Sequence, residues 1–369
     1  MKICIETQTL NHHQRSGLLT YTEGLVNSLS RVDQDNDYFL VYYSLRRAPA
    51  EMPGPDKANF QKHVLRLPDQ EFFSDQILKD RVALPYFLKK HRMDVFHRPA
   101  GYTLPKINGI LKVLTVHDLR TLTMQDDVWA QDIGQYRRSL SEADVCVTVS
   151  ECTKRDLIEH FQLDENKIRV VPLAADERFF PQAADKVSAL KQKIGIQGPY
   201  FLSVGSVPRK NLEGIIRGFA RADIPDDFSL VMTCRMDLEK YRLLVRELGI
   251  EKRVVFLSDL RDDELTALYS GAYCFLFPSL YEGFGLPILE AMQCGVPVIT
   301  SNISSCPEVA GDAALQVNPR DIDHIALKIK DIARDRQLRA FFIRKGFERA
   351  KLFSWDRFAE KMRGIYSGQ

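Results

Sequence analysis

Residues 281–298 read YEGFGLPILEAMQCGVPV and follow the short apolar run CFLFPSL at 274–280. Such a run is typical of a buried strand. Gly283 and Gly285 permit a tight turn after it, and Pro287 suits the first turn of a helix. The order strand, glycine turn, helix leaves unpaired amide N–H groups at the helix start, which is an anion-binding end.

Two carboxylates flank this turn, Glu282 before it and Glu290 about one helical turn inside the helix. An anion-binding helix end does not itself call for carboxylates. The pattern therefore indicates a site at which Glu282 and Glu290 have a further role.

The same alternation of strand and helix runs along most of the chain, from KICIE at 2–6 to PVITS at 297–301. Continuous apolar strands separated by helical patterns indicate parallel sheets covered on both faces. A length of 369 residues, at ~150 residues per domain, suggests two domains. The pattern lapses at 174–198, where we place the join. We predict an α/β fold with two doubly wound Rossmann-like domains, 1–180 and 181–352, whose strand ends face a cleft.

The composition excludes several classes of protein. A hydrophobic content of 45% and a charged content of 27% are those of a globular chain, and a net charge of +2 does not suggest nucleic acid as a partner. The seven cysteines form no CxxC pair, which favours a reducing compartment. The first ten residues, MKICIETQTL, lack the long apolar region of a signal peptide, and no apolar run approaches about 18 residues. We expect a cytoplasmic protein, soluble or peripheral at the inner face of the membrane.

Several candidate residues come directly after predicted strands, where the domains should bind ligands. Gly17 opens a helix, and this alone indicates a turn more often than a site. His117 precedes an aspartate and could bind a ligand or cap the next helix. Gly205 precedes Arg209 and Lys210, two cations suited to a diphosphate, although a solvated basic turn would look the same.

Common nucleotide and hydrolase motifs are absent. The sequence has neither GxGxxG after its first strand, nor a Walker A loop, nor GxSxG, nor HExxH. Its acidic run at 32–37 lacks the glycine and the final glutamate of an EF-hand loop.

Longer stretches resemble glycosyltransferase family 4, whose members are retaining, nucleotide-sugar-dependent enzymes of the GT-B fold. The stretches are TVHDL, TVSECTKRDLIEHF, KIRVVPLAADERFF, FLSVGSVPRKNLEGII, FPSLYEGFGLPILEAMQCGVPVITSN and PEVAGDAAL. The resemblance runs to FSWDRF near the C-terminus, and it implies that residues 353–369 form a helix that crosses back towards the first domain.

The resemblance assigns a role to each candidate residue. It implies that Glu282 lies near the reacting carbon of the donor sugar and that Glu290 accepts hydrogen bonds from the ribose. Arg209 and Lys210 would neutralise the departing diphosphate, and His117 would touch the donor sugar. The remaining donor-binding residues implied by the resemblance are Gly17, Gly205, Phe284, Gly285 and Leu286.

These roles are physically coherent. Breaking a sugar–phosphate bond builds positive charge on the sugar and negative charge on the diphosphate, and fixed charges of opposite sign stabilise both. We expect front-face attack with retention of configuration. Because Arg209 and Lys210 supply the cations, we expect neither a metal nor another cofactor.

The resemblance also implies particular substrates, which the residues alone do not identify. The resemblance is nearest to mannosyltransferases of surface-polysaccharide and lipopolysaccharide O-antigen biosynthesis. We therefore expect GDP-mannose as donor and a glycan or lipid-linked glycan as acceptor, with a UDP-sugar as the alternative donor. Two further readings are a non-catalytic nucleotide-sugar-binding subunit, and an epimerase or phosphorylase on the same fold.

A basic amphipathic stretch at 72–94 could rest on an anionic membrane, although an ordinary solvated helix face would look similar. Its cations are Lys79, Arg81, Lys89, Lys90 and Arg92.

Overall fold

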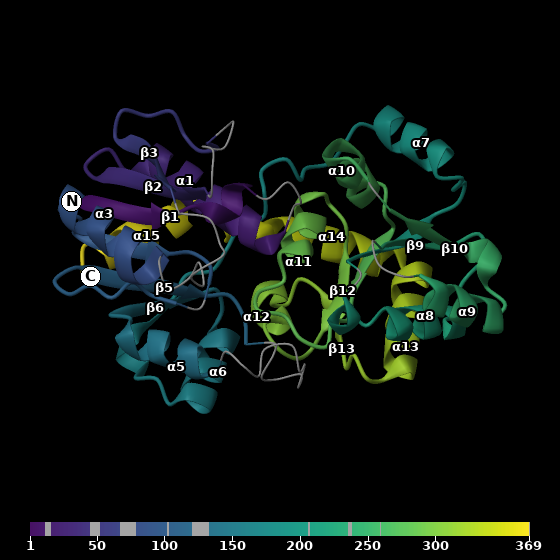
Figure 1. The fold of residues 1–369 in the computed structure, drawn as a ribbon. Helices are drawn as coiled ribbons and strands as arrows, with labels where there is room; N and C mark the ends of the chain where they lie inside the picture. The colour runs from purple at the N-terminus through teal and green to yellow at the C-terminus, as the bar shows by residue number, and fades with distance from the viewer. Residues whose placement is uncertain are drawn as a thin grey trace. The chain divides into compact units, whose positions relative to one another are not determined.

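The computed structural model of the chain contains two parallel sheets, one in each of two units (Figure 1). The structure describes residues 1–11, 16–44, 52–66, 79–101, 103–119, 133–205, 207–234, 238–258 and 260–368. The first unit consists of Met1–Leu173 and Ser354–Gln369, and the second of Ala174–Phe353.

Within its described part, the first unit has a seven-stranded sheet in the order β3-β2-β1-β4-β5-β6-β7. The strands are β1 (Lys2–Glu6), β2 (Asp37–Ser44), β3 (Phe60–Arg66), β4 (Val95–Arg98), β5 (Leu111–Val116), β6 (Val145–Thr148) and β7 (Ile168–Val170). The α-helices are α1 (Gly17–Val32), α3 (Leu84–His91), α5 (Ile133–Glu142), α6 (Glu151–Phe161) and α15 (Trp355–Tyr366). Short turns are the 3-10 helices η1 (Gln8–Asn11) and η4 (Glu165–Lys167), and the π-helix η2 (Lys79–Ala83).

The described second unit has a six-stranded sheet in the order β10-β9-β8-β11-β12-β13. Its strands are β8 (Tyr200–Val204), β9 (Ser229–Thr233), β10 (Val254–Leu257), β11 (Cys274–Phe277), β12 (Val298–Ser301) and β13 (Leu315–Val317). Its α-helices are α7 (Ala184–Lys193), α8 (Leu212–Arg221), α9 (Glu239–Glu247), α10 (Asp262–Ser270), α11 (Leu286–Gln293), α12 (Cys306–Ala310), α13 (Ile322–Arg334) and α14 (Arg336–Ala350). The 3-10 turns η5 (Pro208–Lys210) and η6 (Glu251–Arg253) complete it.

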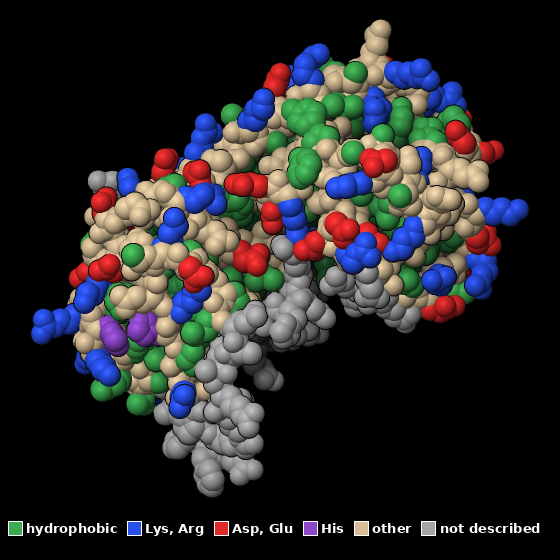
Figure 2. Space-filling model, turned by 90° about the horizontal axis from the view of Figure 1, so that it is seen from above, with side chains coloured by type: hydrophobic (Ala, Val, Ile, Leu, Met, Phe, Trp, Pro, Cys, Tyr) green, Lys and Arg blue, Asp and Glu red, His purple; other side chains and the backbone are tan. Residues whose placement is uncertain are grey.

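The apolar pattern explains why these segments form two α/β units. Strand β1 is buried from its second residue onward and strand β11 along its whole length, and both pair in parallel with neighbouring strands. Tyr21, Leu25 and Leu29 repeat along one face of α1 and are fully buried, as their spacing predicts. The face shown in Figure 2 intersperses acidic and basic side chains, in keeping with the net charge of +2.

The join between the units differs from the boundary that the sequence suggested. It lies between Leu173 and Ala174 rather than after residue 180. Arg178 is paired with Asp262 at 2.6 Å and Phe179 packs edge-on against Tyr269, so these residues belong to the second unit. The polar helix α7, which buries only Leu190, occupies the region where the sequence pattern lapses.

The C-terminal helix α15 packs in the first unit, where its yellow ribbon lies among purple and blue elements in Figure 1. Arg31 of α1 pairs with Asp356 at 2.7 Å. Gly24 of α1 lies against Trp355, and a Cβ atom added to Gly24 would come within 2.3 Å of the indole ring. The absence of a side chain at position 24 therefore allows this helix pair to form.

We expect Gly24→Ala to lower the free energy of unfolding by about 1–3 kcal/mol through overpacking against Trp355. A glycine-to-alanine change in a helix interior is otherwise stabilising by about 1 kcal/mol, so the sign is informative. Gly134→Ala in α5 is the matched control, because a Cβ there has no neighbour within 4 Å. Urea unfolding of both variants tests this, and stabilisation by Gly24→Ala would contradict the packing argument.

A buried histidine also holds α15. His97 is fully buried, with Nδ1 2.7 Å from the Tyr366 hydroxyl and Nε2 2.8 Å from Thr115 Oγ1. Burial lowers the pKa of His97 to about 3, so the ring is neutral in the folded protein at neutral pH.

Stability should consequently fall as the pH drops below about 6.5, the ordinary pKa of histidine. Between that pH and the folded pKa of about 3 for His97, the unfolded chain binds a proton that the folded chain refuses. Over this pH range the free energy of unfolding should therefore fall by up to ~1.4 kcal/mol per pH unit. Urea midpoints at pH 7.5 and 5.0 should differ less in His97→Gln than in the parent, and equal differences would contradict this assignment.

Candidate active site

The strand, glycine turn and helix expected around residue 282 are present in the second unit. Strand β11 ends at Phe277, Gly285 forms the N-cap of α11, and Pro287 lies in the first turn. Gly285 has φ +109°, in the left-handed region that favours glycine. The local sequence thereby places the amide end of an eight-residue helix just beyond the carboxyl end of a parallel strand.

Glu282 forms a buried ion-pair cluster with the two predicted cations. Its carboxylate is paired with Arg209 Nη1 and lies 2.7 Å from Lys210 Nζ. Glu282 is only 5% exposed. Arg209 and Lys210 belong to η5 after β8, and β8 pairs with β11, so the three side chains gather at one edge of the sheet.

The charges in this cluster do not cancel. Burial alone would raise the pKa of Glu282, but Lys210 and Arg209 outweigh it and hold the carboxyl pKa below its ordinary value. Burial lowers the pKa of Lys210, opposed by Glu282 and reinforced by Arg209. With both cations protonated the cluster carries one net positive charge, which suits an anionic ligand.

Gly205 and Phe277 lie alongside the side chain of Lys210. Gly205 has φ +104°, and a Cβ added there would lie 3.3 Å from Lys210 Cε. The Lys210 ammonium lies 4.2 Å from the centroid of the Phe277 ring, within the range of a cation–π contact. The position of Gly205 is thus explained by the close passage of the Lys210 side chain.

The second carboxylate has a different environment. Glu290 Oε2 accepts a hydrogen bond of 2.9 Å from the Tyr269 hydroxyl. Burial raises the pKa of Glu290, while the Tyr269 hydrogen bond and the charge of Arg178 oppose that shift. The two glutamates of the motif therefore differ, since the neighbouring cations lower the pKa of Glu282 whereas burial raises the pKa of Glu290.

The two candidate residues of the first unit lie at the carboxyl edge of its sheet. Gly17 is the first residue of α1, after the N-cap Ser16, and a Cβ there would have no neighbour within 4 Å. His117 follows β5, and its Nε2 lies 2.7 Å from the Pro99 carbonyl oxygen. The cleft expected between these residues and the Glu282 cluster stays a prediction.

Comparison with known proteins identifies the family. Residues 15–179 match the description Glycosyltransferase Family 4, and residues 187–349 match Glycosyl transferases group 1. O-antigen chain mannosyltransferase B of Escherichia coli is 32% identical over 280 aligned residues, in a match that covers 73% of this chain and 73% of the relative. The chain belongs to glycosyltransferase family 4. The family resemblance of the sequence is thereby confirmed, and the protein is a glycosyltransferase.

Two other similarities extend this result. Serotype-specific mannosyltransferase WbdA of Escherichia coli is 31% identical over 236 aligned residues, in a match that covers 60% of this chain but only 28% of that longer protein. Sucrose-phosphate synthase from Thermosynechococcus elongatus has the same fold, with a TM-score of 0.78 and 21% identity over 100% of this chain and 98% of the other. The predicted GT-B architecture of two parallel-sheet α/β domains is confirmed.

Sequence reasoning missed the groups that hold this family 4 motif in place. Ser304 Oγ accepts a hydrogen bond of 2.9 Å from the Glu282 amide and donates one of 2.6 Å to the Glu282 carbonyl. Ser305 Oγ lies 2.7 Å from the Phe284 carbonyl oxygen. The run SNISS, which begins with the last residue of β12, was the available signal, because hydroxyl side chains readily bond to nearby backbone.

Within the ranges given above, no group of three His, Cys, Asp or Glu side chains could hold a metal ion. No helix in the same ranges is long and apolar enough to cross a membrane. The expected independence from metal stays a prediction.

Proposed function

We propose that this family 4 enzyme is a retaining, metal-independent mannosyltransferase that uses GDP-mannose and extends a glycan or lipid-linked glycan in polysaccharide synthesis. The observation that carries the proposal is the buried Glu282 carboxylate between Arg209 and Lys210. The mannosyltransferase names of the two Escherichia coli relatives support the choice of sugar.

The roles follow from charge and position. Arg209 and Lys210 bind the diphosphate, and Glu282 stabilises the positive charge that develops on the sugar. Glu290, with one oxygen held by Tyr269, accepts hydrogen bonds from the ribose. The backbone amides of the turn hold sugar hydroxyls and phosphate; these are the amides of Phe284, Gly285 and Leu286.

The proposed step balances without an added acid or base. The bond from the anomeric carbon to the β-phosphate oxygen breaks as the acceptor oxygen bonds to the same face of that carbon. The acceptor proton passes to the departing phosphate oxygen, so GDP leaves and the configuration is retained. The two cations stabilise the charge that builds on the phosphate.

Thermal unfolding with GDP, UDP and ADP, each with and without EDTA, tests the donor. We expect GDP to stabilise the protein whether or not EDTA is present, by about 2.7 kcal/mol at a hundredfold excess over its dissociation constant. Glu290→Ala should abolish the shift. A shift with UDP alone would overturn the GDP-mannose proposal, and a shift that EDTA removes would overturn metal independence.

The reaction itself is tested by incubating the enzyme with GDP-mannose and following the released sugar or glycan product by NMR. Retention predicts that the transferred mannose keeps its α configuration. A β product would contradict the front-face step. Tight donor binding with no turnover on any glycan acceptor would instead identify a non-catalytic nucleotide-sugar-binding subunit.

We also propose that the first unit makes peripheral contact with an anionic membrane through η2 and α3. Val82 is 57% exposed and Tyr86 67% exposed, one helical turn apart, beside the exposed Lys89 and Lys90. Apolar and basic side chains on one helix face are typical of an interfacial helix. Lys79 does not belong to this face, because its ammonium is buried against Glu6 and Tyr43. Residues 72–78 of the predicted stretch lie outside the described residues.

Sedimentation with vesicles of anionic and of zwitterionic lipid tests this contact. Replacement of Lys89, Lys90 and Arg92 by glutamate should abolish binding to anionic vesicles. The matched control changes three exposed cations of the second unit to glutamate; these are Lys186, Arg336 and Arg344. Equal binding by the two triple variants would contradict the proposal.

A further inference from the structure

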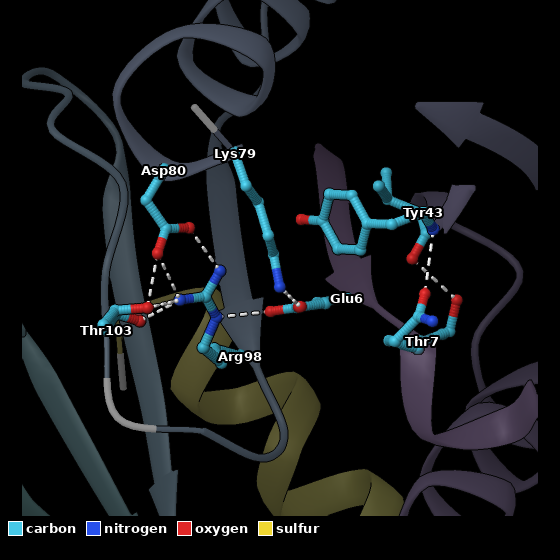
Figure 3. A network of polar contacts seen from close by, with 9 residues as sticks. Glu6, Thr7, Tyr43, Lys79, Asp80, Arg98 and Thr103 are labelled. Atoms are coloured by element: carbon cyan, nitrogen blue, oxygen red, sulfur yellow. Dashed lines mark hydrogen bonds and ion pairs between the residues drawn. The ribbon is translucent and has the colours of Figure 1, made fainter. Parts of the chain in front are cut away.

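A buried ion network lies at the carboxyl edge of the first sheet (Figure 3). Arg98, the last residue of β4, is 1% exposed. Its Nε donates to Glu6, the last residue of β1, and its Nη2 donates to Asp80 Oδ1 at 2.7 Å. Lys79 reaches the same Glu6 carboxylate at 2.5 Å. The buried Arg98, Glu6 and Asp80 and the partly buried Lys79 thus gather close to where Rossmann-like sheets bind their ligands.

This network closes the loop that follows β4. The Arg98 Nη1 donates to both the carbonyl and the hydroxyl of Thr103, and the Thr103 hydroxyl donates to Asp80. Gly101 has φ +118° and lies against the Arg98 side chain, where a Cβ would be 3.4 Å from Cδ. Gly101 and Thr103 therefore both lie against the Arg98 side chain.

The Pro99 carbonyl at the start of this loop fixes the tautomer of His117. A carbonyl oxygen only accepts hydrogen bonds, so the nitrogen 2.7 Å away, His117 Nε2, carries the proton. Burial lowers the pKa of His117, which keeps the ring neutral at neutral pH. Nδ1 then bears the lone pair, and the contacts of the described residues give it no hydrogen-bond partner. Tyr21 packs edge-on against the ring, 4.6 Å between centroids.

We propose that Arg98, held by Glu6 and Asp80, is a positioning residue that sets the tautomer of His117 through the Pro99 carbonyl. The network presents His117 Nδ1 as a hydrogen-bond acceptor for a hydroxyl group of the donor sugar. The inference rests on the proposed function in one respect, namely that His117 touches the sugar. The π-helical turn η2, which carries both Lys79 and Asp80, is of a kind that is frequent at functional sites.

Lysine is the sharpest replacement for Arg98. Arg98→Lys keeps a buried cation between Glu6 and Asp80, but an ammonium cannot reproduce the planar fork that reaches Glu6, Asp80 and Thr103 together. Asp80→Asn is the second variant, in case the first does not fold. The matched control is Asp33→Asn. Asp33 lies shortly before β2 in the same unit, and its fully buried carboxylate accepts hydrogen bonds from Asn36 and Tyr38. Asp33 lies at the opposite edge of the sheet from His117.

The first readout is the tautomer in the free protein. In ¹⁵N-histidine-labelled protein, with the His117 signals assigned by His117→Gln, the parent and Asp33→Asn should show the proton on Nε2. Arg98→Lys and Asp80→Asn should show it shared between Nε2 and Nδ1. An unchanged Nε2–H tautomer in both network variants would overturn the proposal.

The second readout separates positioning from general loss of stability. We expect kcat/KM for the sugar donor to fall about tenfold or more in the network variants, as for other residues that orient an imidazole. The affinity for GDP, which lacks the sugar, should stay unchanged. Equal losses with GDP and with the donor would mean a structural role only and would overturn the proposal. A changed tautomer with unchanged donor turnover would support positioning and contradict the sugar contact of His117.

Discussion

Glu282→Gln is expected to lower kcat by about 10²–10³ without weakening donor binding. The amide keeps the shape of the side chain but removes the negative charge that Arg209 and Lys210 hold in place. A carboxylate that acts on the developing charge of the sugar contributes to the transition state rather than to the bound donor. The loss should therefore appear in kcat and not in KM.

The same change should also weaken the free enzyme. Arg209 and Lys210 would keep their charges in a buried place without their anionic partner, which costs about 3–5 kcal/mol. A diphosphate can supply the missing negative charge, so GDP should stabilise Glu282→Gln more than it stabilises the parent. Thermal unfolding with and without GDP measures the difference.

Glu264→Gln is the matched control for this experiment. Glu264 is 8% exposed, pairs with Lys193 and accepts from the Arg261 amide at 3.0 Å, all in the second unit. Its loss should destabilise the protein without lowering kcat and without any enhanced response to GDP. If Glu282→Gln behaves like this control, Glu282 holds the fold and takes no part in the reaction.

The fold was predictable because its signals are local. Twelve of the described strands coincide with apolar runs that stand out in the sequence. Strand β13 (Leu315–Val317) is the exception, because it is only three residues long and half-buried, so that its residues form no recognisable apolar run. The polar helix α7 was missed because it buries only Leu190, so that no apolar face marks it. Short edge strands and solvent-exposed helices bury few apolar residues, so an apolar pattern in the sequence does not reveal them.

The candidate site was predictable where a motif carries it. The cluster of Glu282, Arg209 and Lys210 joins segments 72 residues apart, and each segment has its own strand-turn signature. The Arg98 network had no such signature. Arg98 lies 92 residues from Glu6 and 18 from Asp80, and only the order β1-β4 in the folded sheet brings them together. For the same reason Lys79 looked like a surface cation in the sequence.

Lys210→Ala should lower kcat/KM for the donor by about 10³, the largest single effect that we expect. The Lys210 side chain is 11% exposed, and its ammonium lies on the Phe277 ring and faces Glu282, so little water can replace its charge when the diphosphate departs. Steady-state kinetics with GDP-mannose, measured with and without EDTA, provide the test. The loss should be the same in both conditions, because the lysine and not a metal ion stabilises the leaving group.

Lys210→Arg separates charge from fit in this experiment. The charge is kept, but the bulkier guanidinium has to pass Gly205, where the present lysine already lies 3.3 Å from the position of a Cβ. We expect this variant to bind GDP and to recover only part of the lost turnover, because the cation no longer meets the phosphate oxygen along the same path. Full activity in Lys210→Ala would contradict the role of the cluster. If EDTA then abolished that activity, the negative charge of the diphosphate would have to be met by a metal ion instead.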